Sequence, residues 1–485
     1  MNTYQNLITM KKIKNIAIVI FLFLASCSKE KLNEIDTNPN IISDAPLNTL
    51  LPAAQMTVVQ RVAASISNLS GFAAEHTNFT GINTATNLHI SGGTHWISGF
   101  QAIRYFKDVR SKAEIQQRVG YAAIADIMTA YTLSVLTDVY GDIPYTDAGT
   151  DDIIQPKFDK AEDLYIEMQK LLDAGIQKCD QATTAASKPA NDDLIFKGNM
   201  TLWKKTAWGL KARLSNRLSN VKPQESAQQA LAAIGNSFAP SEGFIITVYQ
   251  SNPENANPTA NNFMNASTIV IADGIVTAMK SFLEPTEDVL ADPRANIWFT
   301  KIGGKVVTPP TSRATTDVTL NGTLYSKPLY LQNRNSPLPL LTYTELKFIE
   351  AEAQLRLGDK QKAYSAYDAA VRSAMAQSAI FNTTVALTTA QINTYLARPK
   401  VLPGADNLTL KDIITQKYIF LFIFQSQEGF NDVRRTGLIT LNDPDGTAKR
   451  FPYPTDEMTR NANAPQASDF NTVYTPAARL FWAKL

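Results

Sequence analysis

Residues 343–376 read YTELKFIEAEAQLRLGDKQKAYSAYDAAVRSAMA, and two helices can be read directly from this stretch. Apolar side chains recur every three or four positions on each side of Gly358-Asp359, a pair that favours a tight turn. The apolar positions expected on the packed faces are Leu346, Ile349, Ala353, Leu357, Ala363, Tyr367, Ala370, Val371 and Ala374. The stretch therefore predicts a helix–turn–helix unit.

The small and aromatic positions of this unit have the relative spacing of a tetratricopeptide repeat. They are Ala351, Gly358, Ala363, Tyr367 and Ala370. Small residues let the two helices approach closely, and the tyrosine fills the gap between them. Residues 161–172 and 200–214 show the same helical periodicity. The sequence predicts an all-α fold, a tetratricopeptide-like helical repeat scaffold with long irregular loops and short β-hairpins.

Three long segments lack this periodicity: residues 181–193, 251–266 and 301–327. We expect residues 251–266, which are rich in Asn and Pro, to hold no regular helix. Asn321-Gly322 predicts a type I′ hairpin. Long loops in a compact protein are usually functional or disordered, and a helical scaffold that presents loops favours binding over catalysis.

The N-terminus has the order of a secretory signal. Lys11, Lys12 and Lys14 precede an apolar run at residues 16–25, which is too short to span a bilayer. Cys27 follows at once, so the segment resembles a bacterial lipobox, in which the cysteine carries the lipid. An ordinary signal peptide with a chance cysteine is the alternative. We predict a signal peptide at residues 1–26, a lipid-anchored tether at 27–45 and one ligand-binding domain at 46–485.

Charge and cysteine content further limit the possible binding partners and disulfides. Removing the three lysines of the first 26 residues from 46 basic residues leaves 43, against 44 acidic ones. A chain so near neutrality has no basic footprint for nucleic acid and no polybasic attraction to anionic lipid. With Cys27 lipidated, Cys179 has no partner for an intrachain disulfide, and we expect it to pack in the core.

Motifs for catalysis and for metal or cofactor binding are missing from the sequence. It holds no His-Glu-x-x-His, no phosphate-binding loop and no Gly-x-Ser-x-Gly elbow. His76, His89 and His95 lack a metal-ligand spacing, and residues 443–446 favour a turn over a calcium loop. A pair of glycosidase carboxylates stays open, because 44 acidic residues cannot be paired from sequence. We expect a protein that is not an enzyme and binds neither cofactor nor metal.

Several segments together resemble the SusD/RagB-type nutrient-binding lipoproteins. Residues 136–145, LTDVYGDIPY, are similar to the D-x-Y-G-D-I-P-Y segment of that family. The other similar segments follow in the family order at residues 156–173, 203–218, 341–353, 429–437 and 450–454. The resemblance implies an outer-membrane lipoprotein facing the extracellular side. Such a protein captures a nutrient, usually a glycan, and acts as a lid on a TonB-dependent, SusC-like β-barrel transporter.

The motif residues themselves are expected to be framework. We interpret Asp138, Asp142, Arg434 and Arg435 as helix caps and members of partly buried ion pairs. Ligand contacts should then come from the loops.

Sugar recognition needs an exposed aromatic platform beside short polar groups that both donate and accept hydrogen bonds. Trp96 is the first choice, because the family has a tryptophan at the opening of its second helix beside the ligand face. Trp298 is a second candidate, and a core position stays open for both tryptophans. The remaining candidate ligand-binding residues are His89, His95, Tyr325, Asn78, Asn261 and Asn262. Capture of a peptide or another non-sugar nutrient, and a purely structural lid on the transporter, are the alternative functions.

Overall fold

The computed structural model describes residues 45–79, 93–148, 153–265, 268–309, 324–329, 333–378, 386–422, 424–442, 447–465 and 472–483. The chain divides into two units, residues 1–46 and 47–485. The fold described below is that of the second unit. The predicted hairpin at Asn321-Gly322 and the turn at residues 443–446 lie outside the described residues.

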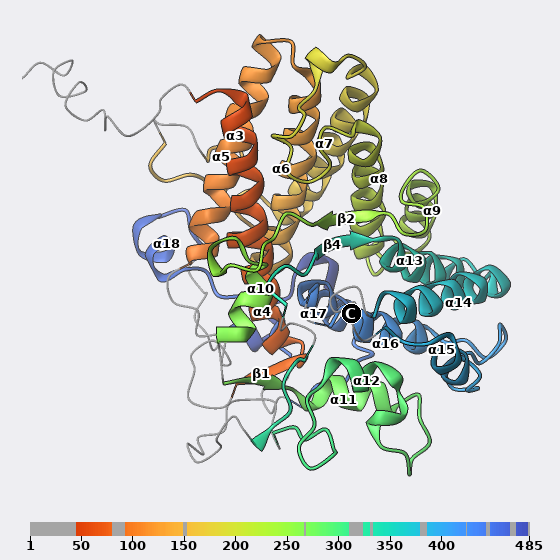
Figure 1. The fold of residues 1–485 in the computed structure, drawn as a ribbon. Helices are drawn as coiled ribbons and strands as arrows, with labels where there is room; N and C mark the ends of the chain where they lie inside the picture. Colours follow the sequence, from red (N-terminus) through yellow and green to blue (C-terminus); the bar gives the residue numbers. More distant parts are fainter. Residues whose placement is uncertain are drawn as a thin grey trace, which may run out of the picture. The chain divides into compact units, whose positions relative to one another are not determined.

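Helices dominate this unit, and they pack in sequence order over much of the chain (Figure 1). In chain order, the unit begins with α3 (Leu47–Met56), a π-helical turn (Thr57–Ala63), α4 (Ala64–Ala73), α5 (Thr94–Ile115), α6 (Val119–Tyr140), α7 (Ala161–Gln181) and α8 (Met200–Arg217). It continues through α9 (Pro223–Ile234), α13 (Tyr343–Arg356), α14 (Lys360–Gln377), α15 (Thr389–Leu396) and α16 (Leu410–Phe420). Shorter helices are α10 (Pro258–Asn265), α11 (Asp273–Lys280), α12 (Pro293–Trp298), α17 (Ser426–Thr436) and α18 (Thr455–Arg460).

The predicted helix–turn–helix unit is present as α13 and α14. Gly358 has a φ of +84°, a conformation that favours glycine, and Asp359 caps α14 by accepting a hydrogen bond from Lys362 N. The apolar positions expected on the packed faces are buried, except that Leu357 is 37% exposed. Leu357 is the C-terminal cap of α13, so its side chain leaves the packed face. The all-α, tetratricopeptide-like fold class is confirmed.

The expectation that residues 251–266 hold no regular helix is wrong. Helix α10 begins at Pro258, where the missing N–H is harmless and the fixed φ suits a first turn. Asn257 supplies the cap, because its Oδ1 accepts hydrogen bonds from Thr259 N and Ala260 N at 2.9 and 3.1 Å. An Asn-Pro pair can therefore start a helix even in a loop-like composition.

Helix α6 is the central core helix. Of the described helices it alone has the length and hydropathy of a membrane span, but its neighbours bury 94% of that window, as in the core of a soluble protein. Its charged Asp126 is paired with Lys178 at 2.6 Å and with Arg110 at 3.2 Å. Cys179 lies buried in α7 beside it, as expected.

Two short antiparallel sheets join segments that are far apart in the sequence. Strand β1 (Thr77–Phe79) pairs with β3 (Ile269–Ile271), in the register Thr77 to Ile271. Strand β2 (Gly243–Ile246) pairs with β4 (Leu338–Thr342), with an irregularity between Phe244 and Ile245. The described strands are therefore not local hairpins. They connect irregular segments to the helical scaffold.

Candidate functional site

The ends of several loop segments are held together at one small assembly, here called the loop frame: β1, β3 and residues 298–309 and 324–329. Ile271 N donates to Ser326 O at 2.8 Å, which adds residue 326 to the β1–β3 pair. Ser326 N in turn donates to Val307 O at 2.8 Å. Thr300 N donates to Lys327 O at 2.9 Å. The frame thus fixes Phe79, which precedes residues 80–92, and both described segments that flank residues 310–323.

Asn257 makes most of the hydrogen bonds that tie α10 to the chain beyond the frame. Besides capping α10, Asn257 donates from Nδ2 to Ser336 O and Pro337 O at 2.9 and 3.2 Å. Asn257 N also donates to Arg334 O at 2.7 Å. This fully buried side chain therefore holds α10 to residues 334–337. Sequence reasoning missed Asn257, although an Asn directly before Pro is a helix-start signal.

Of five predicted ligand-binding residues, three lie in the loop frame and two lie on α10, which ends four residues before β3 in the sequence. Asn78, Trp298 and Tyr325 are buried there, with exposed fractions of 1%, 5% and 8%. Asn261 is half-buried on α10 and accepts a hydrogen bond from Arg334 Nε at 3.2 Å. Asn262 on the same helix is exposed. Of these five residues, Asn262 is therefore the best placed to meet a ligand.

Trp298 has the core position that the sequence left open. Its ring stacks on Phe422 with centroids 5.7 Å apart, and its Nε1 donates to Ser378 O at 3.2 Å. The guanidinium of Arg294 lies 5.7 Å from the ring centroid. These contacts come from α12 itself and from segments that lie far downstream in the sequence, which is why the burial was not predictable from the local pattern.

Trp96 is also buried, at 5% exposure, in an aromatic cluster at the first turn of α5. Its ring centroid lies 4.9 Å from those of Phe100 and Tyr140, in edge-on geometry. Phe158 and Tyr453 complete the cluster, at 6.2 and 5.8 Å. These contacts favour the core alternative over the exposed platform for Trp96.

His95 lies beside this cluster and is only 3% exposed. A short hydrogen bond joins its Nε2 to the hydroxyl of Tyr140. Burial lowers the pKa of His95 to about 4, so the imidazole is neutral at physiological pH. His89 and Cys27 lie outside the described residues. The predicted residues therefore form two groups, one at the loop frame and one at the start of α5, and residues 80–92 connect β1 to α5.

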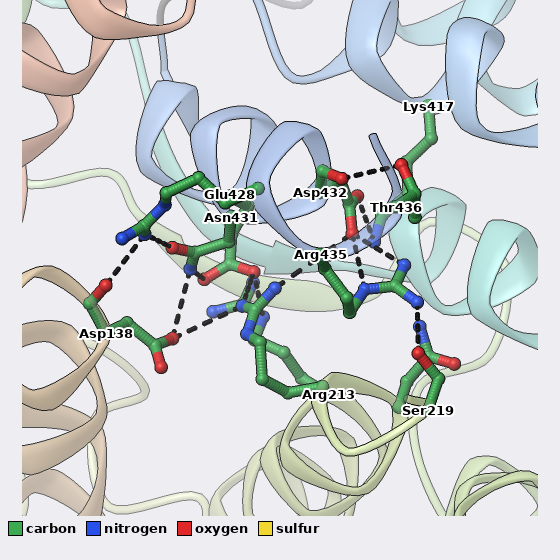
Figure 2. A network of polar contacts seen from close by, with 12 residues as sticks. Asp138, Arg213, Ser219, Lys417, Glu428, Asn431, Asp432, Arg435 and Thr436 are labelled. Carbon is green, nitrogen blue, oxygen red and sulfur yellow. Dashed lines mark hydrogen bonds and ion pairs between the residues drawn. The ribbon is translucent and has the colours of Figure 1, made fainter. Parts of the chain in front are cut away.

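A second polar centre surrounds α17, and we call it the α17 network (Figure 2). Five cationic and five anionic side chains, all buried, define it: Arg213, Arg217, Lys417, Arg434, Arg435, Asp138, Glu345, Glu352, Glu428 and Asp432. They come from α6, α8, α13, α16 and α17. Because the charges balance, the network can lie in the core without a net buried charge.

The pairs within the α17 network are close and mostly multidentate. Arg213 donates to Glu345 through Nε at 2.8 Å and through a terminal nitrogen at 2.6 Å. Arg435 Nη2 donates to Glu352 Oε2 and Asp432 Oδ1, both at 2.8 Å. Lys417 Nζ lies 2.8 Å from Asp432 Oδ2. Such geometry fixes the relative positions of the helices that carry the groups.

The electrostatics of the network follow from burial and pairing. Burial alone would raise the pKa of Asp432, but the charges of Lys417 and Arg435 bring that pKa below its usual value. At Glu352 burial likewise raises the pKa, but the charge of Arg435 outweighs it, so the pKa of Glu352 is lowered. At Asp138 burial outweighs the charge of Arg217, so the pKa of Asp138 is raised. Apart from Arg434, the groups are therefore occupied with one another rather than with a ligand.

The motif residues form a helix cap and buried polar contacts, as expected, with two differences. Asp142 caps α7 from outside, since its Oδ1 accepts a hydrogen bond from Ala161 N at 2.9 Å. Asp138, Arg434 and Arg435 are fully rather than partly buried. Arg434 donates to the backbone oxygens of Asp138 and Lys449, at 2.7 and 3.0 Å, instead of forming an ion pair within the described residues.

Comparison with known proteins agrees with this framework. The SusD-like family model, described as starch-binding associating with outer membrane, matches residues 38–455. No curated protein matches this chain.

Solved structures share the fold. A SusD/RagB family protein from Bacteroides thetaiotaomicron superposes with a TM-score of 0.74 at 20% identity, covering 91% of this chain and 99% of that chain. A SusD homolog from Bacteroides fragilis gives 0.74 at 21%, covering 91% and 100%. A chitin-binding SusD homolog from Flavobacterium johnsoniae gives 0.70 at 18%, covering 90% and 98%. The resemblance inferred from the ordered motifs is confirmed: this chain belongs to the SusD-like family of outer-membrane-associated binding proteins.

Proposed function

We propose that this chain is a cell-surface lipoprotein that binds a glycan or oligosaccharide and delivers it to a TonB-dependent, SusC-like outer-membrane transporter. The match of a family described as starch-binding associating with outer membrane, over residues 38–455, carries the proposal. One similar structure is named a chitin-binding SusD homolog, and starch and chitin are both polysaccharides. On this proposal, lipid on Cys27 anchors residues 46–485 to the extracellular face, and the chain binds its ligand without transforming it.

The loop frame is the part of the molecule best suited to present a ligand site. Through backbone hydrogen bonds it holds Phe79, which precedes residues 80–92, and the two described segments that flank residues 310–323. The exposed Asn262 lies on α10, which ends four residues before β3 in the sequence. An asparagine side chain both donates and accepts hydrogen bonds, as a sugar hydroxyl requires. His89 lies within residues 80–92 and adds a second candidate contact. The ligand is therefore assigned to the loop frame rather than to the α17 network, whose groups already pair with one another.

Affinity electrophoresis tests this proposal. Soluble protein that starts after Cys27 is run through gels that contain starch, chitin-derived oligosaccharides or other polysaccharides. We expect one glycan to retard the wild type, and Asn262→Ala and His89→Ala to weaken the retardation. Gln361→Ala is the matched control, because Gln361 is an exposed amide on α14, away from the loop frame. It should migrate like the wild type.

Two results would contradict the proposal. Free migration in every glycan gel, with binding of oligopeptides in calorimetry, would favour peptide capture. Absence of any soluble ligand, with failure of transport when the lipoprotein is deleted, would favour a purely structural lid. Equal retardation of all variants would keep glycan binding but remove the loop frame as its site.

A further inference from the structure

A cavity of about 310 Å³ lies beside the C-terminal end of α17 and is lined by three cationic side chains. Arg434 comes from α17, Lys449 from the segment after it, and Arg479 from the C-terminal segment. No acidic residue is among the described residues that line this cavity. We refer to it as the basic cavity. Three segments that are separate in sequence thus bring like charges to one place.

Like charges held together in this way repel one another. Burial and then the charges of Arg479 and Arg434 lower the pKa of Lys449 from its ordinary value. No carboxylate in the described part of the chain offsets this effect at Lys449, which forms no ion pair there. An anion in the cavity would relieve the repulsion.

Arg434 gives the basic cavity a fixed wall. The side chain is only 6% exposed, and its guanidinium donates to the backbone oxygens of Phe430, Asp138 and Lys449 and to Asn431 Oδ1. A guanidinium has five N–H donors, so one N–H on the nitrogen that bonds to Lys449 O remains for another acceptor. The group is therefore oriented before any ligand arrives.

The remaining lining residues complement these cations. Thr440 and Thr447 supply hydroxyl groups, and the apolar wall is formed by Val433, Ile439, Leu441 and Ala483. An apolar wall lowers the local dielectric and strengthens the attraction between a cation and an anion. Gly437 and Thr440 are exposed, so the cavity opens to solvent on this side.

We propose that the basic cavity binds an oxyanion, either a carboxylate or a sulfate group. The group can be a free ion or can be carried on a larger molecule, since the cavity has the size of a small-ligand site. The proposal does not depend on neutral-glycan binding at the loop frame, and either can fail without the other.

Isothermal titration calorimetry with sodium sulfate tests the site, with sodium chloride at equal ionic strength as the reference. The protein is the chain without residues 1–27, which keeps the whole compact unit of residues 47–485. We expect saturable sulfate binding in the wild type. Lys449→Met keeps the aliphatic stem but removes the charge, and it should weaken binding at least about tenfold. Lys449→Arg should keep most of the affinity.

Lys188→Met is the matched control. Lys188 is also half-buried and lines a different cavity that contains further lysines, so its loss should leave sulfate affinity unchanged. Arg479→Gln is a second variant, from the C-terminal segment that lines the basic cavity, and thermal melts without sulfate check that each variant is folded. Glucose 6-sulfate, titrated against glucose, separates a carried anion from a free one: tighter binding than inorganic sulfate supports the carried form, and equal binding supports the free form.

Three results overturn the proposal. The first is the absence of saturable sulfate binding in the wild type. The second is unchanged sulfate binding in both Lys449→Met and Arg479→Gln when these variants are folded. The third is binding that appears only in an Asp443→Asn/Asp445→Asn variant. These two aspartates lie between the lining residues Leu441 and Thr447 in sequence, so that result would assign the cavity to the chain's own carboxylates.

Discussion

The α17 network and the loop frame are held together in opposite ways. In the network, side chains of opposite charge fix five helices to one another, as in the contacts of Arg435 with Glu352 and Asp432. In the loop frame, backbone groups make most of the connections, such as Leu329 N to Trp298 O at 2.6 Å. Side-chain pairing demands particular residues, whereas backbone pairing accepts almost any.

This difference explains where the recognisable sequence lies. Residues 136–145, 203–218, 341–353 and 429–437 carry the family resemblance. They contribute eight of the ten residues of the network: Asp138, Arg213, Arg217, Glu345, Glu352, Asp432, Arg434 and Arg435. The loop frame can hold loops of very different sequence on the same scaffold. A family built in this way can change its ligand without changing its core.

The largest loss of stability is expected from a variant that breaks the α17 network. Arg435→Ala leaves Glu352 and Asp432 buried without their shared partner, and we expect a loss of about 3–5 kcal/mol in the free energy of unfolding. Urea denaturation followed by circular dichroism measures it. Arg372→Ala, in an exposed pair with Asp368 on α14, should change stability by less than about 0.5 kcal/mol. Similar losses for the two variants would contradict the framework role.

Trp96→Ala separates a core tryptophan from a ligand platform. The substitution empties the centre of the aromatic cluster, so we expect a loss of about 3 kcal/mol in unfolding free energy. Glycan affinity per folded molecule should stay within about twofold of the wild type, because the ring is buried; a loss of binding without a loss of stability would restore Trp96 as the platform. Trp96→Phe serves as the control and should cost much less than the alanine variant. Calorimetric melting and affinity electrophoresis of the same samples provide the two readouts.

Acid should destabilise the protein through its buried histidines. The pKa of His95 is lowered to about 4 by burial, against about 6.5 in an unfolded chain, so the unfolded state binds more protons below pH 6.5. The stability is fully present above pH 6.5 and falls as the pH drops toward 4. Between pH 7.5 and 5.0 we expect His95 to account for a loss of about 2 kcal/mol.

His95→Gln should make this pH dependence shallower, as measured by urea denaturation at the two pH values. It will not remove the dependence, because burial also lowers the pKa of His76, to about 3. Identical pH curves for the wild type and His95→Gln would contradict the assignment of a buried, neutral imidazole.

The smallest loss of stability is expected from a variant that tests how α10 is held near the proposed ligand site. Asn257→Ala removes the cap of α10 and its bonds to Ser336 O and Pro337 O, and we expect a loss of about 1–2 kcal/mol. Glycan retardation should weaken as well, because α10 then loses its fixed position. Asn262→Ala is the control on the same helix, with a stability change below about 0.5 kcal/mol. Unchanged binding in Asn257→Ala would show that α10 does not position the ligand site.

Local patterns predicted the helical scaffold well, because apolar spacing and turn residues act over a few positions. The α13–α14 unit with its Gly358 turn is the clearest case. Helix α10 was missed because composition was given more weight than the Asn257-Pro258 start. The burial of Trp96 and Trp298 depends on Tyr453, Phe422 and other distant residues, and nothing near the tryptophans in sequence reports those contacts.

The charge of Asp126 in α6 has a consequence for the unfolded chain. If the chain is exported unfolded across an inner membrane, as the proposed function requires, α6 has the length and hydropathy at which a translocation channel can release a segment sideways into lipid. A charged residue near the middle of such a segment disfavours that release by about 2.5–3.5 kcal/mol. Asp126, which lies well inside α6 and is neutralised by Lys178 once the fold forms, supplies that charge. On that proposal, the carboxylate that pairs with Lys178 in the folded core also disfavours insertion of the unfolded chain into the bilayer.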